Sequence, residues 1–276
     1  MEKGTLLLRW AAWTAGFTGI VVGTTIQPTS VWAQASHSAN SERIESLSFN
    51  SSQPDGFEDT GRPANQTSTG SRSSGSCLSR LIALVPGSEP LTTQPEGCSA
   101  PDSLLALTLD DAPTFWFYVP PEQLSSVVYT EFVLLDENQR PLYRERIVLS
   151  GESGIIGVQL TQPLEVNRLH RWTFQILMTD EPSRDPVVEG FVKRIEPDTT
   201  LSNQLITATS PQERIRIYAN HGVWHDTLTE LAEWRRAHPS DANLESDWTN
   251  LLTSVGLEAI ANAPLLNCCT SEPISH

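Results

Sequence analysis

The sequence predicts a mainly β protein with a helical C-terminal region: an immunoglobulin-like antiparallel β-sandwich followed by helices. Short runs rich in β-favouring residues are separated by Pro, Gly, Asp and Asn until about Ile195. Beyond Ile195 the apolar residues recur at steps of three and four, which is typical of helices. The start of the chain has the features of an export signal. The predicted regions are a signal peptide (1–33), a disordered Ser-rich spacer (34–76), the β-sandwich (77–196), the helical region packed on the sandwich (197–268) and a tail (269–276).

The first 33 residues are expected to direct export to the periplasm or the extracellular space. Basic Lys3 and Arg9 precede an uncharged apolar run from Trp10 to Ile26, and small Ala33 follows at a suitable cleavage point. We expect cleavage after Ala33. An uncleaved membrane anchor is the less favoured alternative, because the apolar run is shorter than the roughly 20 residues that a spanning helix needs.

The charge balance excludes several classes of partner. The chain has 18 basic and 33 acidic residues and a formal net charge of −15. Such a surface repels nucleic acid and offers no basic patch for direct binding to anionic lipid. We therefore expect the partner to be an envelope protein or a peptide. Neither a phosphate-binding loop nor a dinucleotide-binding glycine pattern occurs, so no cofactor is expected.

The spacer and the cysteines both fit an exported protein. Residues 34–76 are dominated by Ser, Asn, Thr, Gly and Gln, and cannot bury enough apolar surface to offset the entropy of ordering. Four cysteines, Cys77, Cys98, Cys268 and Cys269, would meet an oxidising compartment. A local disulfide between Cys77 and Cys98 is favoured, although four cysteines allow three pairings.

The sandwich is predicted from eight short runs. One of them, Phe115 to Val119, has almost no polar alternation and is expected to be buried on both faces. The tryptophans, including Trp116, Trp172, Trp224 and Trp248, are interpreted as core residues rather than as a sugar-binding surface. The runs are 81–85, 104–109, 114–119, 127–135, 142–149, 155–160, 171–178 and 187–195.

Three helices are predicted after the sandwich. The first begins at a capping box, in which Ser210 and Glu213 flank Pro211. The second spans about 223–237, and the third carries an apolar stripe from Leu244 to Val255 and ends at Gly256. Gly222, Trp224, Leu228 and Pro239 fall at the spacing of a single tetratricopeptide unit. We therefore expect a TPR-like helical hairpin and a short third helix, packed on the sandwich.

Several segments together resemble the domain of unknown function 928 family, which consists of uncharacterised exported proteins of photosynthetic bacteria. The most specific are the Phe-Trp-Phe-Tyr-Val-Pro run at 115–120 and the Gly-x-Trp-x-Asp motif at 222–226. The resemblance covers about 77–268 and implies no known activity. Two positions depart from it, since relatives usually carry Gly at Asn167 and Tyr at His170. A tyrosine there would tie the corner of an immunoglobulin-like sandwich to nearby backbone.

The sequence motifs do not favour an enzymatic activity. His221 and His225 are four residues apart, but the glutamate of the zinc-binding helix motif is missing, so no metal site is expected. Asp226 is explained by its position in the first turn of a helix, where the helix dipole favours a carboxylate. No nucleophile elbow is present, because the segment 151–154 is better interpreted as a turn.

The sequence therefore predicts a non-enzymatic binding or structural module of the cell envelope, with a partner surface formed by Trp224, His225, Asp226 and Trp234. Two alternatives stay open. One is an envelope hydrolase that pairs Asp226 with a carboxylate near Asp110 or Asp111, which requires a solvent-filled cleft joining them. The other is a peptide-binding module that uses the helical hairpin.

Overall fold

The computed structural model describes residues 46–50, 80–86, 105–125, 127–178 and 185–267, together with the backbone of 270–273. These residues belong to one unit, which comprises 45–276. The expected signal peptide, most of the expected spacer and all four cysteines, including the proposed pair Cys77 and Cys98, lie outside the described residues.

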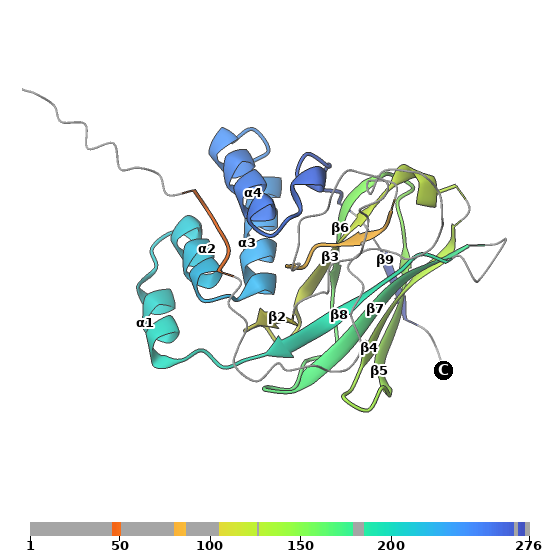
Figure 1. Cartoon of the computed structure of the whole chain (residues 1–276), viewed down its shortest axis with the longest axis horizontal. Helices are drawn as coiled ribbons and strands as arrows, with labels where there is room; N and C mark the ends of the chain where they lie inside the picture. Colours follow the sequence, from red (N-terminus) through yellow and green to blue (C-terminus); the bar gives the residue numbers. More distant parts are fainter. Residues whose placement is uncertain are drawn as a thin grey trace, which may run out of the picture. The chain divides into compact units, whose positions relative to one another are not determined.

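The described strands form a three-stranded sheet in the order β1-β3-β6 and a six-stranded sheet in the order β2-β8-β7-β4-β5-β9 (Figure 1). The fold is thus mainly β with helices at the C-terminal end, as the sequence predicts. The strands are β1 (Ile82–Ala83), β2 (Leu105–Thr108), β3 (Thr114–Val119), β4 (Val127–Leu135), β5 (Pro141–Val148), β6 (Gly154–Gln159), β7 (Leu169–Met178), β8 (Val187–Arg194) and β9 (Thr270–Pro273).

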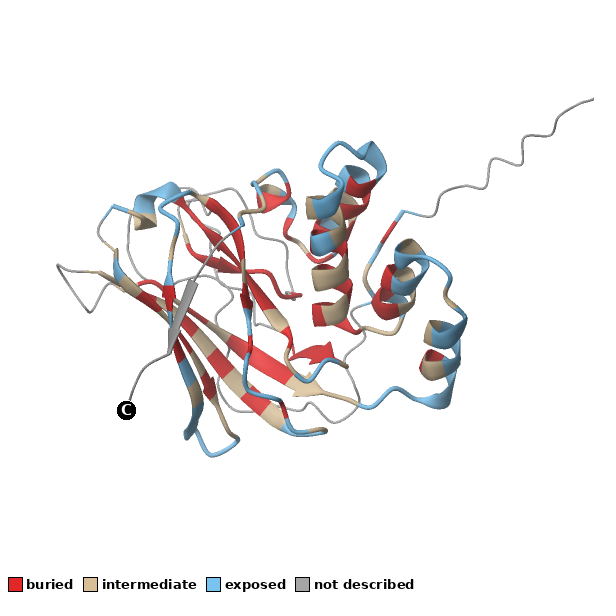
Figure 2. Ribbon diagram, turned by 180° about the vertical axis from the view of Figure 1, so that it is seen from behind, coloured by how far each residue is buried: buried red, intermediate tan, exposed pale blue. Residues whose placement is uncertain are grey.

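Aromatic side chains join the two sheets. Phe117 of β3 stacks on Phe174 of β7, with ring centroids 4.0 Å apart, and Phe115 packs against Phe132 and Trp172. Residues Phe115 to Val119 are all buried, which confirms the prediction for this run. Figure 2 shows the buried residues concentrated on the strands and on one side of the helices. Burial of this apolar area is the main source of the stability of the fold.

One strand pair differs from the predicted antiparallel arrangement. β2 runs parallel to β8, with Leu105 opposite Phe191 and Thr108 opposite Arg194. Parallel neighbours need a long connection, which the intervening strands supply here. Because β2 lies at the end of its sheet and α3 packs against it, this edge is covered by a helix. The pairing brings the end of β2 beside the helical region.

Four α-helices follow β8: α1 (Thr199–Thr207), α2 (Pro211–Asn220), α3 (Trp224–Ala237) and α4 (Ala242–Ser254). The last three agree with the predicted helices. The sequence pattern does not reveal α1, because Leu201 is its single fully buried side chain. Its start is nevertheless fixed locally, since the Asp198 side chain accepts a hydrogen bond from the backbone N–H of Leu201. A strand at 270–273 also replaces part of the expected tail.

Two glycines set the ends of the helices. Gly222 has φ of 69° and Gly256 has φ of 76°, values that side-chain-bearing residues rarely adopt. After Gly256 the backbone N–H of Leu257 donates to the carbonyl of Leu252, which satisfies a carbonyl at the end of α4. Gly222 closes α2 in the same way and allows α3 to begin two residues later. This geometry explains the glycine in the Gly-x-Trp-x-Asp motif.

Residues 46–50 pack on the helices and so depart from the disordered spacer predicted for 34–76. Leu47 is buried, and the ring of Phe49 lies edge-on to Trp224 with centroids 4.8 Å apart. The backbone N–H of Phe49 donates to Ser254 Oγ at 3.0 Å. Two apolar residues and backbone hydrogen bonds to Ser254 and to the Ala219 carbonyl hold this short segment on the helices.

The corner before β7 contains Asn167 and His170, the two positions where we expect relatives to carry Gly and Tyr. Asn167 has φ of 60°, which glycine adopts more readily. His170 is buried, and its Nδ1 has no hydrogen-bond partner within the described residues. Burial lowers the pKa of His170, and a hydrogen bond with the backbone of Arg168 opposes this shift.

Candidate functional site: an acidic pocket between sheet and helices

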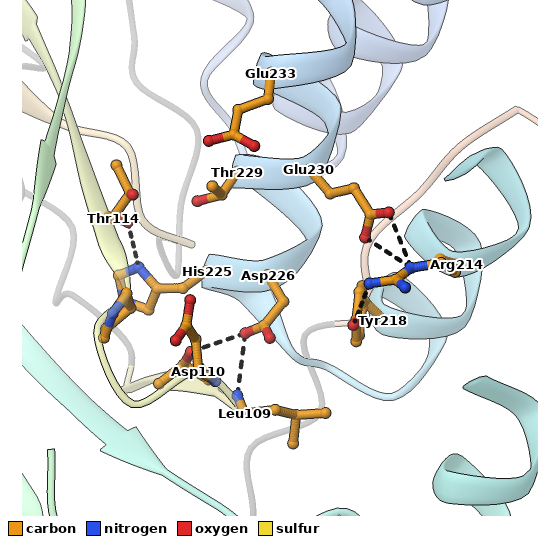
Figure 3. Close-up of a pocket in the computed structure, with 12 residues that line it drawn as sticks. Leu109, Asp110, Thr114, Arg214, Tyr218, His225, Asp226, Thr229, Glu230 and Glu233 are labelled. Atoms are coloured by element: carbon orange, nitrogen blue, oxygen red, sulfur yellow. Dashed lines mark hydrogen bonds and ion pairs between the residues drawn. The ribbon is translucent and has the colours of Figure 1, made fainter. Parts of the chain in front are cut away.

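A candidate site is the pocket of about 480 Å³ where the end of β2 meets α2 and α3 (Figure 3). This volume lies within the range of ligand pockets in proteins. The pairing of β2 with β8 and the packing of α3 on β2 bring together residues more than 100 positions apart. The lining residues are Thr108, Leu109, Asp110, Pro113, Thr114, Arg214, Tyr218, His225, Asp226, Thr229, Glu230 and Glu233.

Asp226 connects the sheet to the helices. It lies in the first turn of α3, and its Oδ2 accepts hydrogen bonds from the Thr108 hydroxyl at 2.8 Å and from the Leu109 backbone N–H at 3.1 Å. Burial raises the pKa of this carboxyl to about 6, and the charge of Asp110 adds to the rise, while the two hydrogen bonds oppose it. The surroundings of Asp226 therefore disfavour the charged form of its carboxyl group.

Three more carboxylates line the same space. Asp110 lies in the turn after β2, where its Oδ1 accepts a hydrogen bond from the backbone N–H of Ala112 at 3.0 Å. Glu230 and the exposed Glu233 lie on α3. Burial raises the pKa of Glu230, while the neighbouring Arg214 guanidinium lowers it. The pocket is thus strongly acidic.

Arg214 of α2 is the one basic side chain in the lining. It forms an ion pair with Glu230 at 3.0 Å and donates a hydrogen bond to the Tyr218 hydroxyl at 3.3 Å (Figure 3). Burial raises the pKa of Tyr218, so this side chain is a neutral phenol at pH 7. Arg214 therefore has its partners within the protein.

His225 lines the pocket beside Asp226 but has a different character. It is only 2% exposed, and its ring packs edge-on against Phe115. Its Nδ1 lies 3.1 Å from the carbonyl oxygen of Thr114. Since a carbonyl can only accept, Nδ1 carries the proton. Burial lowers the pKa of His225 to about 4, so the ring is neutral at pH 7.

The structure separates the four residues of the expected partner surface. Trp224 is fully buried; its Nε1 donates to the carbonyl of Leu84 at 2.8 Å, and Phe49 covers its ring. His225 is buried too, so neither ring forms part of an exposed surface, although His225 is one of the residues that line the pocket. Asp226 lines the pocket, whereas the half-buried Trp234 does not. The burial of Trp224 has a physical reason: its apolar ring fills the junction between helices and sheet.

The proposed carboxylate pair is brought together in part. Asp110 and Asp226 line one pocket, while Asp111 is not among the lining residues. Nε2 of His221 lies 2.7 Å from Gln204 Oε1, whereas His225 contacts the carbonyl of Thr114, so the two histidines have different partners. Within the described residues, no group of three or more His, Cys, Asp or Glu side chains is arranged to hold a metal ion. None of the described helices is long and apolar enough to cross a membrane.

Sequence reasoning missed the contribution of Arg214, Tyr218, Glu230 and Glu233. A signal for the helix residues is present: Asp226, Thr229, Glu230 and Glu233 recur at steps of three, four and seven, and therefore share one face of α3. The apolar residues of the same helix indicate only the face that packs against the core. Recognising the polar stripe would have placed a carboxylate-rich surface beside Asp226.

Comparison with known proteins bears on the family alone. The search of curated proteins returned no match. The model of the family described as Domain of Unknown Function (DUF928) matches residues 67–265, which include both sheets apart from β9, all four α-helices and the complete pocket lining. Because the match covers most of the chain and agrees with the resemblance of the two specific motifs, this protein belongs to the DUF928 family.

Proposed function

We propose that this protein is a non-enzymatic binding module of the cell envelope and that the acidic pocket is its ligand site. The observation that carries this proposal is the pocket itself, a ligand-sized space assembled by the sheet and by two helices. The partner is an envelope protein or a peptide. The acidic composition argues against nucleic acid and anionic lipid as partners.

The envelope location rests on the N-terminal sequence. The basic start, the apolar run and Ala33 favour export through a cleaved signal peptide, to the periplasm or the extracellular space. The N-terminal sequence of the protein isolated from its native cells tests this step. A protein that starts at Gln34 agrees with it, whereas retention of Met1 contradicts it.

We also propose the finer architecture: an immunoglobulin-like sandwich joined to a TPR-like hairpin. Contact between the aromatic residues of two facing sheets supports the first part. The packing of α2 on α3 across Gly222 supports the second. A single helical pair must bury its apolar face on another element, and here the sandwich provides that element.

The hydrogen bonds of the pocket favour binding over catalysis. One oxygen of Asp226 is occupied by Thr108 and Leu109, and Asp110 is tied to its own turn. Thr229 accepts a hydrogen bond from Trp116 Nε1 at 3.0 Å, so one lone pair of its hydroxyl is engaged within the protein. These hydrogen bonds therefore stabilise the fold, and the remaining acceptor atoms of the same groups are left at the surface of the pocket.

Charge reversal at the rim tests the proposal. Glu233 is exposed, so Glu233→Lys changes the charge of the pocket without disturbing the core. Exposed Glu152 lies outside the pocket, and Glu152→Lys is the matched control. We expect envelope proteins retained by the immobilised full chain to be retained by E152K and lost with E233K. If both variants retain the same proteins in equal amounts, the pocket is not the binding site.

A hydrolase that uses a carboxylate pair is the second candidate. It is favoured by the position of Asp110 and Asp226 in one pocket and by the raised pKa of Asp226, which suits a general acid near neutral pH. A panel of chromogenic glycosides and esters tests this candidate. Turnover by the wild-type chain that is lost in both Asp110→Asn and Asp226→Asn establishes a hydrolase, while turnover unchanged in both variants rules out this pair.

A further inference from the structure

Among the described residues that line the pocket, carboxylates outnumber basic groups. Four carboxylates line it, those of Asp110, Asp226, Glu230 and Glu233, against the single guanidinium of Arg214. That guanidinium is paired with Glu230 and bonded to Tyr218. Within the described part of the chain, the other three carboxylates have no ion-pair partner.

The carboxylates also repel one another. The charge of Asp110 raises the pKa of Asp226, and the charges of Asp226 and Glu233 raise the pKa of Glu230. A positive group placed between them would remove this repulsion and would meet several acceptors at once. The pocket is therefore complementary to a cation.

His225 provides an independent observation that points to a ligand with donor hydrogens. Its Nδ1–H donates a hydrogen bond to the carbonyl of Thr114, so in the neutral ring Nε2 is an acceptor. Nε2 is buried and has no hydrogen-bond partner within the described residues. Buried polar atoms are nearly always paired in native proteins, so this unpaired acceptor on a pocket-lining residue is able to accept a hydrogen bond from a ligand donor.

The cation is organic rather than a metal ion. No three of the described carboxylates and histidines converge closely enough to ligate a metal. The acidic groups instead spread along α3 from Asp226 to Glu233, a distance of about 10 Å at the rise of an α-helix. A stripe of this length suits a segment of peptide chain that carries its charge on a side chain.

We propose that the acidic pocket binds the ammonium or guanidinium group of a lysine or arginine side chain in a peptide segment of the partner. The proposal rests on the proposed binding function and deepens it. The side-chain nitrogen lies among Asp110, Asp226 and Glu233, and the peptide backbone follows the polar stripe of α3.

Calorimetry on the full chain tests the ligand class. The probe is the terminally blocked peptide Gly-Ser-Lys-Ser-Gly, compared with the same peptide carrying Nε-acetyllysine, which keeps the side chain and removes its charge. We expect acetylation to weaken binding at least about tenfold. Asp226→Asn and Glu233→Gln are expected to weaken binding of the lysine peptide, whereas Glu152→Gln leaves it unchanged. Because Glu233 is exposed, E233Q remains informative if D226N fails to fold.

Three outcomes would overturn this inference, and they differ in what they mean for the proposed function. Equal binding of both peptides shows that the pocket takes a peptide without recognising its charge, and the binding function stands. Butylamine that binds as tightly as the lysine peptide shows a site for a free amine instead. If the lysine peptide does not bind, the ligand class is wrong, while loss of envelope partners in E233K would still support the binding function.

Discussion

The carboxylate of Asp226 in α3 accepts a hydrogen bond from the hydroxyl of Thr108 in β2, at 2.8 Å. Thr108 in turn accepts from the backbone N–H of Asp110, at 3.1 Å. One side chain of the helical region thus fixes the turn that carries a second carboxylate of the pocket.

Asp226→Asn should change how stability depends on pH. Asparagine can accept the same hydrogen bonds but cannot ionise. The folded-state pKa of Asp226 is raised from 3.8 to about 6, so the folded protein binds more protons than the unfolded chain between these values. The free energy of unfolding of the wild type should therefore fall, relative to D226N, as pH rises from 3.8 to about 6. Urea unfolding across this range measures the difference, and parallel curves would contradict the shift.

Asp226→Ala serves as the contrasting variant, since it removes the acceptor as well as the charge. The Leu109 N–H and the Thr108 hydroxyl then lose their partner, at a cost of about 1–3 kcal/mol when such groups stay buried. D226A should be less stable than D226N at pH 7. Equal stability would show that the hydrogen bonds do not hold the turn.

His225 should have the opposite pH dependence. Its pKa falls from 6.5 in the unfolded chain to about 4 in the folded protein, so the unfolded chain binds more protons between these values. Stability is fully present above pH 6.5 and is lost as pH falls toward 4, by about 3 kcal/mol in total. His225→Asn, which keeps a donor for Thr114, should show a smaller loss in urea unfolding. An equal loss in both proteins would exclude His225 as the cause.

Gly190→Ala should destabilise the sandwich. A Cβ at this position of β8 would clash with Cζ2 of the fully buried Trp172. Overpacking of this kind costs about 1–3 kcal/mol. The double variant G190A/W172F should lose less stability than the sum of the two single variants, because the smaller ring makes room for the methyl group. Strict additivity in thermal unfolding would show that the two residues do not meet.

Trp224→Phe should loosen the junction between helices and sheet. The substitution keeps most of the apolar contact with Phe49 but leaves the carbonyl of Leu84 without its donor at 2.8 Å. An unpaired buried carbonyl costs about 1–3 kcal/mol. Hydrogen exchange should accelerate at the start of α3 and around 81–85. The half-buried Trp234 provides the control, and Trp234→Phe should leave exchange at 81–85 unchanged.

Eight of the nine described strands and three of the helices could be predicted because local signals define them. The run from Phe115 to Val119 has the composition of a buried strand, and Ser210 with Glu213 begins α2. The parallel pairing of β2 with β8 has no local signal, since it depends on contact between residues far apart in the chain. α1 was missed because little of it is buried, and the segment 46–50 because its anchors are two isolated apolar residues.

In the candidate site, too, the features with a local sequence signal could be predicted and those that depend on distant contacts could not. Asp226 and Asp110 could be named from the sequence, although nothing in it measures the space between them. Arg214 and Tyr218 join them through the packing of α2 on α3, which no local pattern encodes. Trp224 was named for the right motif but the wrong role, because a tryptophan at a helix start looks the same in a sequence whether it faces a partner or the core.

The carboxyl pKa of Asp226, measured by carbon NMR with and without the lysine peptide, tests the central claim most directly. In the free protein the pKa is expected near 6, because the carboxyl is buried among other carboxylates. Binding of an ammonium group beside it should lower this pKa by one unit or more, roughly the effect of a close opposite charge. A pKa of Asp226 that stays the same when the pocket is saturated with the peptide would contradict the account.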